Sequence, residues 1–439
     1  MYLPPNVLYC IEKLENAGYA TYAVGGCVRD ACLGHTPHDY DLCTAATPDV
    51  TAAIFAHHNL VKAGEKHGTI GVVLDKEVIE ITTFRTEGSY TDSRHPQWVS
   101  FVPDIERDLA RRDFTVNAMA YSPSRGFADP FGGQADLKNH ILRAVGDPFL
   151  RFTEDALRIL RGVRFAVRFG LSVESETQKA MENLASRMEF LAKERIFDEL
   201  CKLLPLVRAE DLLRFAPIVT AVIPELADTI GFDQRSNHHA YDIFTHTAYV
   251  VDTVPAELPL RWAALLHDIG KPATFTLDES GQGHFYGHAE KSAALADAIL
   301  RRLKAPTQLR EDAVFLIEKH MLPLSADPKL LRRRLSQYGE GRLTMLLQLQ
   351  QADFCAKGVI GDTGDFSAIE TALQQILAEN ACLTIKDLAI NGHDLLELGY
   401  TGPAIGQALQ ALLDAVLDDR LPNERSALLH ALHRLHSAN

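Results

Sequence analysis

The sequence contains no apolar run of about 18 residues, so it predicts no membrane-spanning helix. Its opening, "MYLPPNVLYCIEKL", has neither the basic flank nor the apolar core of a signal peptide. The seven cysteines are scattered and never stand in CxxC spacing, which argues against a zinc ribbon and indicates reduced thiols. There is also no fixed-period repeat and no low-complexity region. These absences together predict a cytoplasmic protein with no membrane partner.

Positive charge is scarce as well. The 439 residues include 44 Lys and Arg against 58 Asp and Glu, which gives a formal net charge of −14. Because affinity for phosphate groups needs positive charge, this balance taken alone argues against a nucleic-acid partner. A negative net charge does not exclude local basic surfaces, so positively charged patches have to be looked for one by one. The hydrophobic content of 46% is ordinary for a globular protein, and the length is ample for several domains.

The sequence pattern changes near residue 150. Before it, "YATYAVGG", "GTIGVVL" and "VIEITTF" indicate strands, whereas helical patterns dominate afterwards. "TEDALRILRGVRFAVRFG" predicts one helix with a polar cap and a closing glycine. The predicted fold class is α+β: a small N-terminal α/β head, with a mixed sheet and flanking helices, followed by an elongated all-α body. We place the domain boundaries at 1–148 for the head, 149–235 for a helical neck, 236–357 for a helical middle domain and 358–439 for a C-terminal helical segment.

Two aspartates alternate in "HDYDL". On a strand, Asp39 and Asp41 would point to one face of the sheet, and adjacent carboxylates repel each other unless a cation lies between them. Mg²⁺ prefers a few carboxylates together with phosphate oxygens and water. Two such ions can activate an attacking hydroxyl and stabilise a leaving pyrophosphate. A bare pair of this kind is at least as often a solvated acidic turn.

A glycine pair precedes these aspartates in "VGGCVRDACLG". The N–H groups of Gly25 and Gly26, together with Arg29, could cradle a triphosphate. Neither pair is specific by itself, but their combination in one strand–turn–strand unit favours a nucleotide site. "GEKHGT" lacks the GK[ST] ending of a P-loop and does not count toward this interpretation.

With "ERDLARRDFTVNAMAY" and "RFTEDALRILRGVRFAVRFGL", these motifs resemble the bacterial CCA-adding enzymes, class II tRNA nucleotidyltransferases of the polymerase β-like superfamily. The resemblance runs from about residue 20 to 205. It implies that Asp39 and Asp41 are catalytic and bind two Mg²⁺ ions, and that Gly26 and Arg29 contact the nucleotide. It places the "RRDFTVNA" element near the sugar and triphosphate, although a charged helix start that caps itself is the alternative. The residues of that element are Arg111, Arg112, Asp113 and Asn117.

The "EDALR" motif, with Glu154, Asp155 and Arg158, resembles the base-selecting element of the same family. Cytosine and adenine each present an amino donor beside a ring-nitrogen acceptor, whereas uracil and guanine present the reverse polarity. The carboxylate of Asp155 and the guanidinium of Arg158, three apart on one helix, would therefore accept C and A alike. A wrong base would leave buried polar groups unpaired, at about 1–3 kcal/mol each. Without the resemblance, the pair would be an ordinary surface ion pair.

Arginines recur along the same predicted helix at spacings of three, three and four: Arg158, Arg161, Arg164 and Arg168. Such a stripe is usually a solvated face, but here it supplies local positive charge for a triphosphate and an RNA end. The resemblance implies nucleotide contacts for the first three. The polar stretch Glu87–Phe101 resembles the loop that complete CCA-adding enzymes need to switch from C to A addition, with Asp92 and Arg94 available for coupling.

A second group of candidates lies in the helical part, where "LLHDIGKP" places a histidine beside an aspartate. With a histidine upstream and an aspartate downstream, the order resembles the HD metal-dependent phosphohydrolase superfamily. Such ligands suit a divalent transition metal or Mg²⁺ that polarises water against a phosphoester. His288 and His320 could complete a binuclear site or be ordinary packed histidines, and the centre could be catalytic or only brace the helices. The resemblance to the HD superfamily implies four metal ligands: His246, His267, Asp268 and Asp353.

The resemblance predicts a template-independent nucleotidyltransferase that adds or repairs the 3′-terminal CCA of tRNA from CTP and ATP with Mg²⁺. "GYTGP" in the last segment either presents N–H groups to tRNA phosphate or simply connects two helices. Two rivals stay open. One is a bacterial poly(A) polymerase, although "AGEKHGTIGVV" stands where a basic "GRRF"-like stretch would be expected. The other is an HD phosphohydrolase whose head only binds RNA or nucleotide.

Overall fold

The computed structural model describes residues 1–87, 99–236, 240–358, 366–379 and 381–436. Two compact units are formed, Met1–Ala227 with Arg302–Lys304, and Asp228–Arg301 with Ala305–Asn439. Within the described ranges, no helix combines the length and apolar character needed to cross a membrane. Asp92 and Arg94 of the expected C-to-A switching loop lie outside the described residues.

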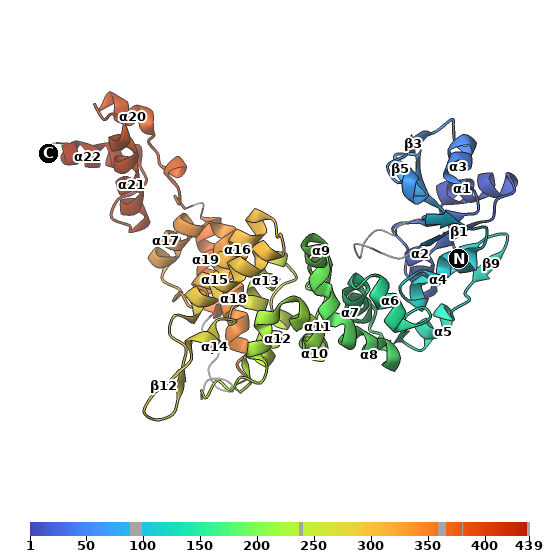
Figure 1. Ribbon diagram of the computed structural model, residues 1–439. Helices are drawn as coiled ribbons and strands as arrows, with labels where there is room; N and C mark the ends of the chain where they lie inside the picture. Colours follow the sequence, from blue (N-terminus) through green and yellow to red (C-terminus); the bar gives the residue numbers. More distant parts are fainter. Residues whose placement is uncertain (88–98, 237–239, 359–365, 380, 437–439) are drawn as a thin grey trace. The chain divides into compact units, whose positions relative to one another are not determined.

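A seven-stranded mixed sheet forms the centre of the first unit, in the order β3-β4-β5-β2-β1-β8-β9 (Figure 1). β2 and β5 run parallel, and the other neighbouring pairs run antiparallel. The mixed sheet expected for the head is therefore confirmed. The strands are β1 Thr21–Val24, β2 Asp41–Thr44, β3 Asn59–Val61, β4 Thr69–Leu74, β5 Glu77–Thr83, β8 Ala120–Ser122 and β9 Gly126–Ala128.

Short helices flank this sheet, and a core of apolar side chains including Val24, Phe84 and Leu109 holds them to it. A separate two-stranded ladder pairs β6 (Arg85–Glu87) with β7 (Val99–Phe101). The register of β1 against β2 pairs Val24 with Asp41, so the end of one strand meets the start of the other. The helical elements here are α1 Pro5–Asn16, α2 Gly26–Cys32, α3 Pro48–Ile54, η1 Glu65–His67, α4 Ile105–Ala110, η2 Thr115–Asn117 and α5 Gly133–Lys138.

The rest of the first unit is helical apart from a short parallel ladder. In this part Gly162 lets one helix pack closely on the head, because a Cβ there would lie 2.9 Å from the Phe114 ring. The elements are β10 Ile141–Leu142, α6 Pro148–Glu154, α7 Leu157–Phe169, β11 Ser172–Val173, α8 Ser175–Leu184, η3 Ala185–Phe190, α9 Lys193–Leu203, α10 Ala209–Arg214, α11 Ala216–Val222 and η4 Pro224–Thr229.

The helix expected from "TEDALRILRGVRFAVRFG" is in fact two helices. Asp155 is extended, with φ −144° and ψ 102°, and separates α6 from α7. Its Oδ1 accepts a hydrogen bond from the backbone N–H of Leu157 at 3.0 Å, so the aspartate caps the second helix. The predicted end is confirmed, because Gly170 closes α7 in a left-handed conformation at φ +60°. Asp155 and Arg158 therefore do not share one helix.

The second unit is built of helices, as expected, with one two-stranded hairpin that the sequence did not predict. Leu395, Leu412 and Leu428 belong to an apolar core of the last helices. The four-domain division stays a prediction. The elements are α12 Ile243–Thr253, α13 Leu258–Leu266, α14 Lys271–Thr274, β12 Thr276–Leu277, β13 Gly283–His284, α15 His288–Arg302, α16 Thr307–Lys319, α17 Pro328–Tyr338, α18 Glu340–Cys355, α19 Phe366–Ala378, η5 Ile385–Asp387, α20 Gly392–Glu397, α21 Pro403–Leu417 and α22 Arg425–His436.

Candidate active site and candidate metal centre

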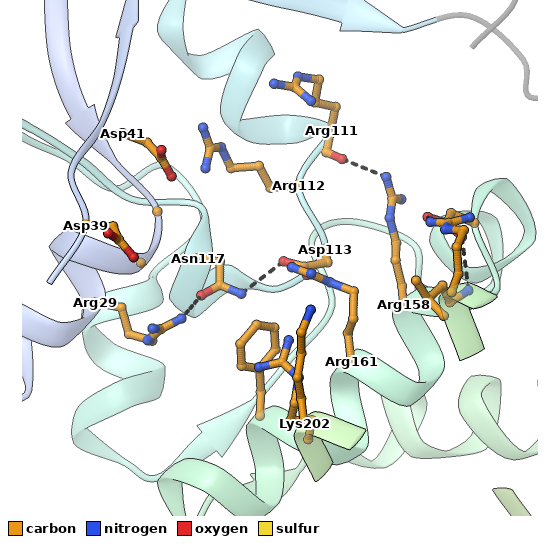
Figure 2. Close-up of a pocket in the computed structure, with 17 residues that line it drawn as sticks. Arg29, Asp39, Asp41, Arg111, Arg112, Asp113, Asn117, Arg158, Arg161 and Lys202 are labelled. Carbon is orange, nitrogen blue, oxygen red and sulfur yellow. Dashed lines mark hydrogen bonds and ion pairs between the residues drawn. The ribbon is translucent and has the colours of Figure 1, made fainter. Parts of the chain in front are cut away.

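One cavity of about 900 Å³ in the first unit is lined by most of the residues predicted for a nucleotide site, although not by Glu154 or Arg168 (Figure 2). It also contains residues that the sequence did not single out, notably Arg195 and Lys202 of α9. The predicted residues brought together are Gly26, Arg29, Asp39, Asp41, Arg111, Arg112, Asp113, Asn117, Asp155, Arg158, Arg161 and Arg164.

The two aspartates stand at one side of this cavity. Asp41 is the first residue of β2, whereas Asp39 precedes the strand, so the expectation that both lie on a strand is wrong for Asp39. Both are exposed, and among the described residues neither carboxylate forms a hydrogen bond or an ion pair. Desolvation by the surrounding protein raises the pKa of Asp41; the charge of Asp39 adds to this rise and Arg112 opposes it. Two unpaired neighbouring carboxylates fit a divalent cation.

A third carboxylate, Glu80, comes from the strand beside Asp41. The parallel register pairs Leu42 with Ile81, so the residues one position earlier, Asp41 and Glu80, are also level with each other. Glu80 lines a second cavity, of about 650 Å³, together with Asp39 and Asp41. The alternation in "VIEITTF" places Glu80 between buried isoleucines and hence on the opposite face, but the pairing of β5 with β2 is not visible in the sequence.

The glycine pair leads from β1 directly into α2, so the expected strand–turn–strand unit is a strand–turn–helix–strand unit. Gly25 has φ +71°, and a Cβ there would lie 2.7 Å from Nη1 of Arg112. Arg29, on α2, is buried and donates from Nη1 to Oδ1 of Asn117 at 2.6 Å. It also pairs with Asp30, and its guanidinium lies 4.4 Å from the centre of the Phe169 ring. Burial lowers the pKa of Arg29.

A chain of hydrogen bonds continues from Arg29 across the cavity wall. Asn117 donates from Nδ2 to Oδ1 of Asp113 at 3.1 Å, and Arg161 donates from Nε to the other Asp113 oxygen at 2.8 Å. Although burial opposes ionisation, Arg161 and Asn117 lower the pKa of Asp113 to about 2. Asn117 is buried and uses both ends of its amide, so it positions Arg29 and Asp113.

The adjacent arginines of the "ARRDF" stretch share a fully buried carboxylate. Asp108 on α4 accepts from Arg111 at 2.9 Å and from Arg112 at 3.3 Å, and it also accepts from the backbone N–H of Arg85 at 3.2 Å. Burial opposes ionisation of Asp108, but the two arginines hold its pKa below the ordinary value. Asp108 was not among the predicted residues, although its spacing of three and four from the arginines is the signal of a helical ion pair.

The two base-selecting residues approach the cavity from separate elements and each has a partner. Oδ2 of Asp155 accepts from Arg195 on α9 at 2.9 Å. Arg158 donates to Glu154 at 2.8 Å and to the backbone oxygen of Arg111 at 3.1 Å. Asp155 and Arg158 are therefore not neighbours on one helix face, as expected. Each is instead held in place by its own charged partner. Arg164 is likewise committed, in a buried ion pair with Glu199 of α9.

Six predicted ligands converge in the second unit. His246, His267 and Asp268 form one group of possible ligand atoms that lie within 4.8 Å of one another, and Asp268, His288 and His320 form another. Asp353 adds a carboxylate 2.9 Å from Nε2 of His246. Lys271, which the sequence did not single out, pairs with Asp268 at 2.7 Å.

The four histidines are oriented alike. Each turns Nδ1 to a backbone carbonyl oxygen, at 3.3 Å for His246, 2.8 Å for His267, 2.8 Å for His288 and 2.6 Å for His320. A carbonyl can only accept, so Nδ1 of each ring carries a proton and Nε2 is the nitrogen directed toward the centre. This arrangement is typical of metal-binding histidines.

Two observations show that a cation fits this centre. Nε2 of His288 and Nε2 of His320 are 3.2 Å apart, although both are acceptors in this tautomer. Nε2 of His267 and Oδ1 of Asp268 are buried and have no hydrogen-bond partner among the described residues. Burial and the neighbouring His267 lower the pKa of His320 to about 4, so this side chain is neutral at neutral pH. Burial opposes ionisation of Asp268, but His267 and Lys271 keep its pKa well below the ordinary value.

Three known protein families match segments that together make up most of the chain. Residues 21–143 match the family described as the poly A polymerase head domain. Residues 170–229 match one described as a probable RNA and SrmB-binding site of polymerase A, and residues 285–432 match the second domain of tRNA nucleotidyltransferases. The first match contains Asp39, Asp41 and the "RRDFTVNA" element.

Individual relatives extend over nearly the whole chain. The CCA-adding enzyme of Latilactobacillus sakei is 33% identical over 434 residues, which cover 96% of each chain. That of Streptococcus sanguinis is 34% identical over 420 residues, covering 95% of this chain and 94% of the relative. Among solved structures, the Bacillus stearothermophilus CCA-adding enzyme in complex with CTP is similar, with a TM-score of 0.71, 27% identity and full coverage of both chains.

Proposed function

The chain belongs to the CCA-adding enzymes, a family of tRNA nucleotidyltransferases, and from this premise we propose that it adds or repairs the complete 3′-terminal CCA of tRNA from CTP and ATP. One observation carries the proposal. The acidic pair, the phosphate-binding arginines and the base-selecting pair, which are spread over more than 100 residues of sequence, line one cavity. The relative solved with CTP supports a cytidine nucleotide as the occupant of this cavity.

In the proposed reaction the terminal 3′-hydroxyl of tRNA attacks the α-phosphorus of the nucleotide. The new P–O bond forms as the bond to pyrophosphate breaks, and the hydroxyl proton is lost to solvent. Asp39 and Asp41 would hold Mg²⁺, which supplies charge stabilisation for the attacking and leaving oxygens. Glu80, level with Asp41 on the neighbouring strand, is the natural third carboxylate at this edge.

The base is selected by groups that are fixed before it arrives. Arg195 and the backbone N–H of Leu157 hold the two oxygens of Asp155, and Glu154 holds Arg158. A carboxylate oxygen has a second lone pair for the amino group of cytosine or adenine, and Arg158 has further N–H donors for a ring nitrogen. Uracil and guanine would set a carbonyl against the carboxylate and leave both groups unsatisfied.

Incubation with Mg²⁺ and tRNA that lacks its CCA end tests this proposal. We expect growth by two nucleotides with CTP alone and by a third when ATP is added. A long ladder with ATP alone would indicate a poly(A) polymerase instead. Absence of growth under every condition would favour an RNA- or nucleotide-binding head and contradict the proposal.

We propose a metal-dependent phosphohydrolase as a second function, in the HD-type centre of the middle domain. The support is that four histidines and two carboxylates form two adjacent groups of possible ligands, which share Asp268. A divalent transition metal or Mg²⁺ held there would supply an activated water for hydrolysis of a phosphoester. Metal content of the purified protein, before and after His267→Ala, tests the binding. Release of nitrophenol from bis(4-nitrophenyl) phosphate tests the chemistry, and metal binding without hydrolysis would leave the centre a structural brace.

A further inference from the structure

Helix α9 presents three charged residues to the cavity region on one face. Arg195, Glu199 and Lys202 stand at positions i, i+4 and i+7, which are neighbours on a helix surface. Arg195 binds Asp155 at 2.9 Å, and Glu199 is buried in its ion pair with Arg164. Glu199, the glutamate nearest to Lys202 on the helix, therefore pairs with Arg164 and not with Lys202.

Lys202 differs in this respect from the arginines of the cavity. Within the part of the chain that the structure describes, Lys202 forms no ion pair and no hydrogen bond, although it lines the cavity. An ammonium group with three rotatable donors and no protein partner keeps its charge available to an anionic ligand. The arginine pairs are Arg29 with Asp30, Arg111 and Arg112 with Asp108, Arg158 with Glu154, Arg161 with Asp113, Arg164 with Glu199, and Arg195 with Asp155.

The position of Lys202 indicates which anion it meets. Figure 2 shows Asp39 and Asp41 on one side of the cavity and Arg158 on the opposite side. Lys202 stands at a third edge, on the side of Arg29 and away from Arg112, with its amine directed inward. Suppose that the base of the nucleotide lies at Arg158 and its α-phosphate at the two aspartates. The charged groups that still need a binding partner are then the terminal phosphates. These phosphates carry its most concentrated negative charge. The RNA end, by contrast, must present a neutral hydroxyl to the aspartates.

We propose that Lys202 binds the terminal phosphates of the incoming nucleotide, the part that leaves as pyrophosphate. It thereby makes the cavity prefer a triphosphate over a monophosphate. This assignment rests on the proposed function only in taking the cavity as the nucleotide site. In this proposal Asp155 and Arg158 select the base, and Lys202 independently selects for the triphosphate.

Equilibrium binding of CTP and CMP to the full-length protein, each with Mg²⁺, tests the assignment. We expect Lys202→Met to weaken CTP binding about five- to twentyfold, because a partly solvated charged hydrogen bond is lost, and to leave CMP binding unchanged. Lys202→Arg should restore most of the CTP affinity. Lys179→Met is the matched control, since Lys179 is an exposed lysine of the same unit that pairs with Glu176 on α8, and it should change neither affinity.

Three results would overturn the assignment. Equal losses for CTP and CMP would show that Lys202 only supports the cavity wall. An unchanged CTP affinity would show that it does not meet the nucleotide. A raised KM for tRNA with unchanged CTP binding would assign Lys202 to an RNA phosphate. The proposed function fails separately: wild-type protein that does not extend tRNA, but whose Lys202→Met variant loses its CTP-over-CMP preference, would contradict CCA addition and still support the role of Lys202.

Discussion

Replacing Arg195 with methionine removes the cation that holds Oδ2 of Asp155, while it keeps a side chain of similar length on α9. The two side chains are mostly buried, at 21% and 14% exposure, and their hydrogen bond is 2.9 Å long. A hydrogen bond to a charged group contributes about 1.5–3 kcal/mol, and each 1.4 kcal/mol is a factor of ten. We therefore expect kcat/KM for CTP and for ATP to fall roughly tenfold to a hundredfold.

Base discrimination separates this effect from a general loss of structure. Because we propose that Asp155 binds the amino group of the base, we expect incorporation of UTP relative to CTP to rise in Arg195→Met, measured by single-nucleotide extension of tRNA that lacks CCA. Arg195→Lys should fall between the variant and the wild type. Arg187→Met is the matched control, because Arg187 is an exposed arginine on η3 of the same unit and does not line the cavity. A hundredfold loss for CTP with an unchanged CTP-to-UTP ratio would refute the positioning of Asp155 by Arg195.

Three further predictions concern the hydrogen-bond chain and the metal centre. Asn117→Asp should keep the bond to Arg29 but repel Asp113, and so lower kcat/KM at least tenfold; a variant with wild-type kinetics would exclude the chain. Since the pKa of Asp113 is lowered to about 2, its ionised form stabilises the fold by about 2 kcal/mol above the ordinary pKa near 4, and this stability is lost as the pH falls toward 2. Urea unfolding at pH 5 and pH 3 should show a smaller pH dependence in Asp113→Asn than in the wild type, and equal slopes would contradict it. His288→Ala should lower the bound divalent metal, measured by elemental analysis, whereas an exposed histidine such as His393 should be replaceable without effect; retention of all the metal would exclude His288 as a ligand.

The residues that line the candidate nucleotide site could be picked out from the sequence because local motifs carry them. The acidic pair, the glycines and the arginine-rich elements are each contiguous in sequence, and the resemblance supplied their relation. The break between α6 and α7 was missed because a helical pattern continues on both sides of Asp155. The available signal was the residue type: aspartate is a preferred N-cap, and here it caps Leu157.

Other site residues depend on tertiary structure that no local pattern records. Glu80 reaches the aspartates only through the parallel register of β5 and β2, and Arg195 reaches Asp155 only through the packing of α9 beside α7. The meeting of His288 and His320 cannot be read from the sequence for the same reason. Their ring nitrogens meet because α15 and α16 bring them to one point, which spacing in the sequence does not specify.

We propose that one cavity, with Asp39 and Asp41 at its edge, builds C, C and A on tRNA. The most direct measurement offers tRNA that lacks its CCA end all four nucleoside triphosphates in equal amounts and sequences the products. We expect the wild type to add C, C and A and then stop, and we expect Asp39→Ala, with an unchanged unfolding transition, to add nothing. Addition of uridine or guanosine at these positions, extension beyond three nucleotides, or growth by the Asp39→Ala variant would contradict it.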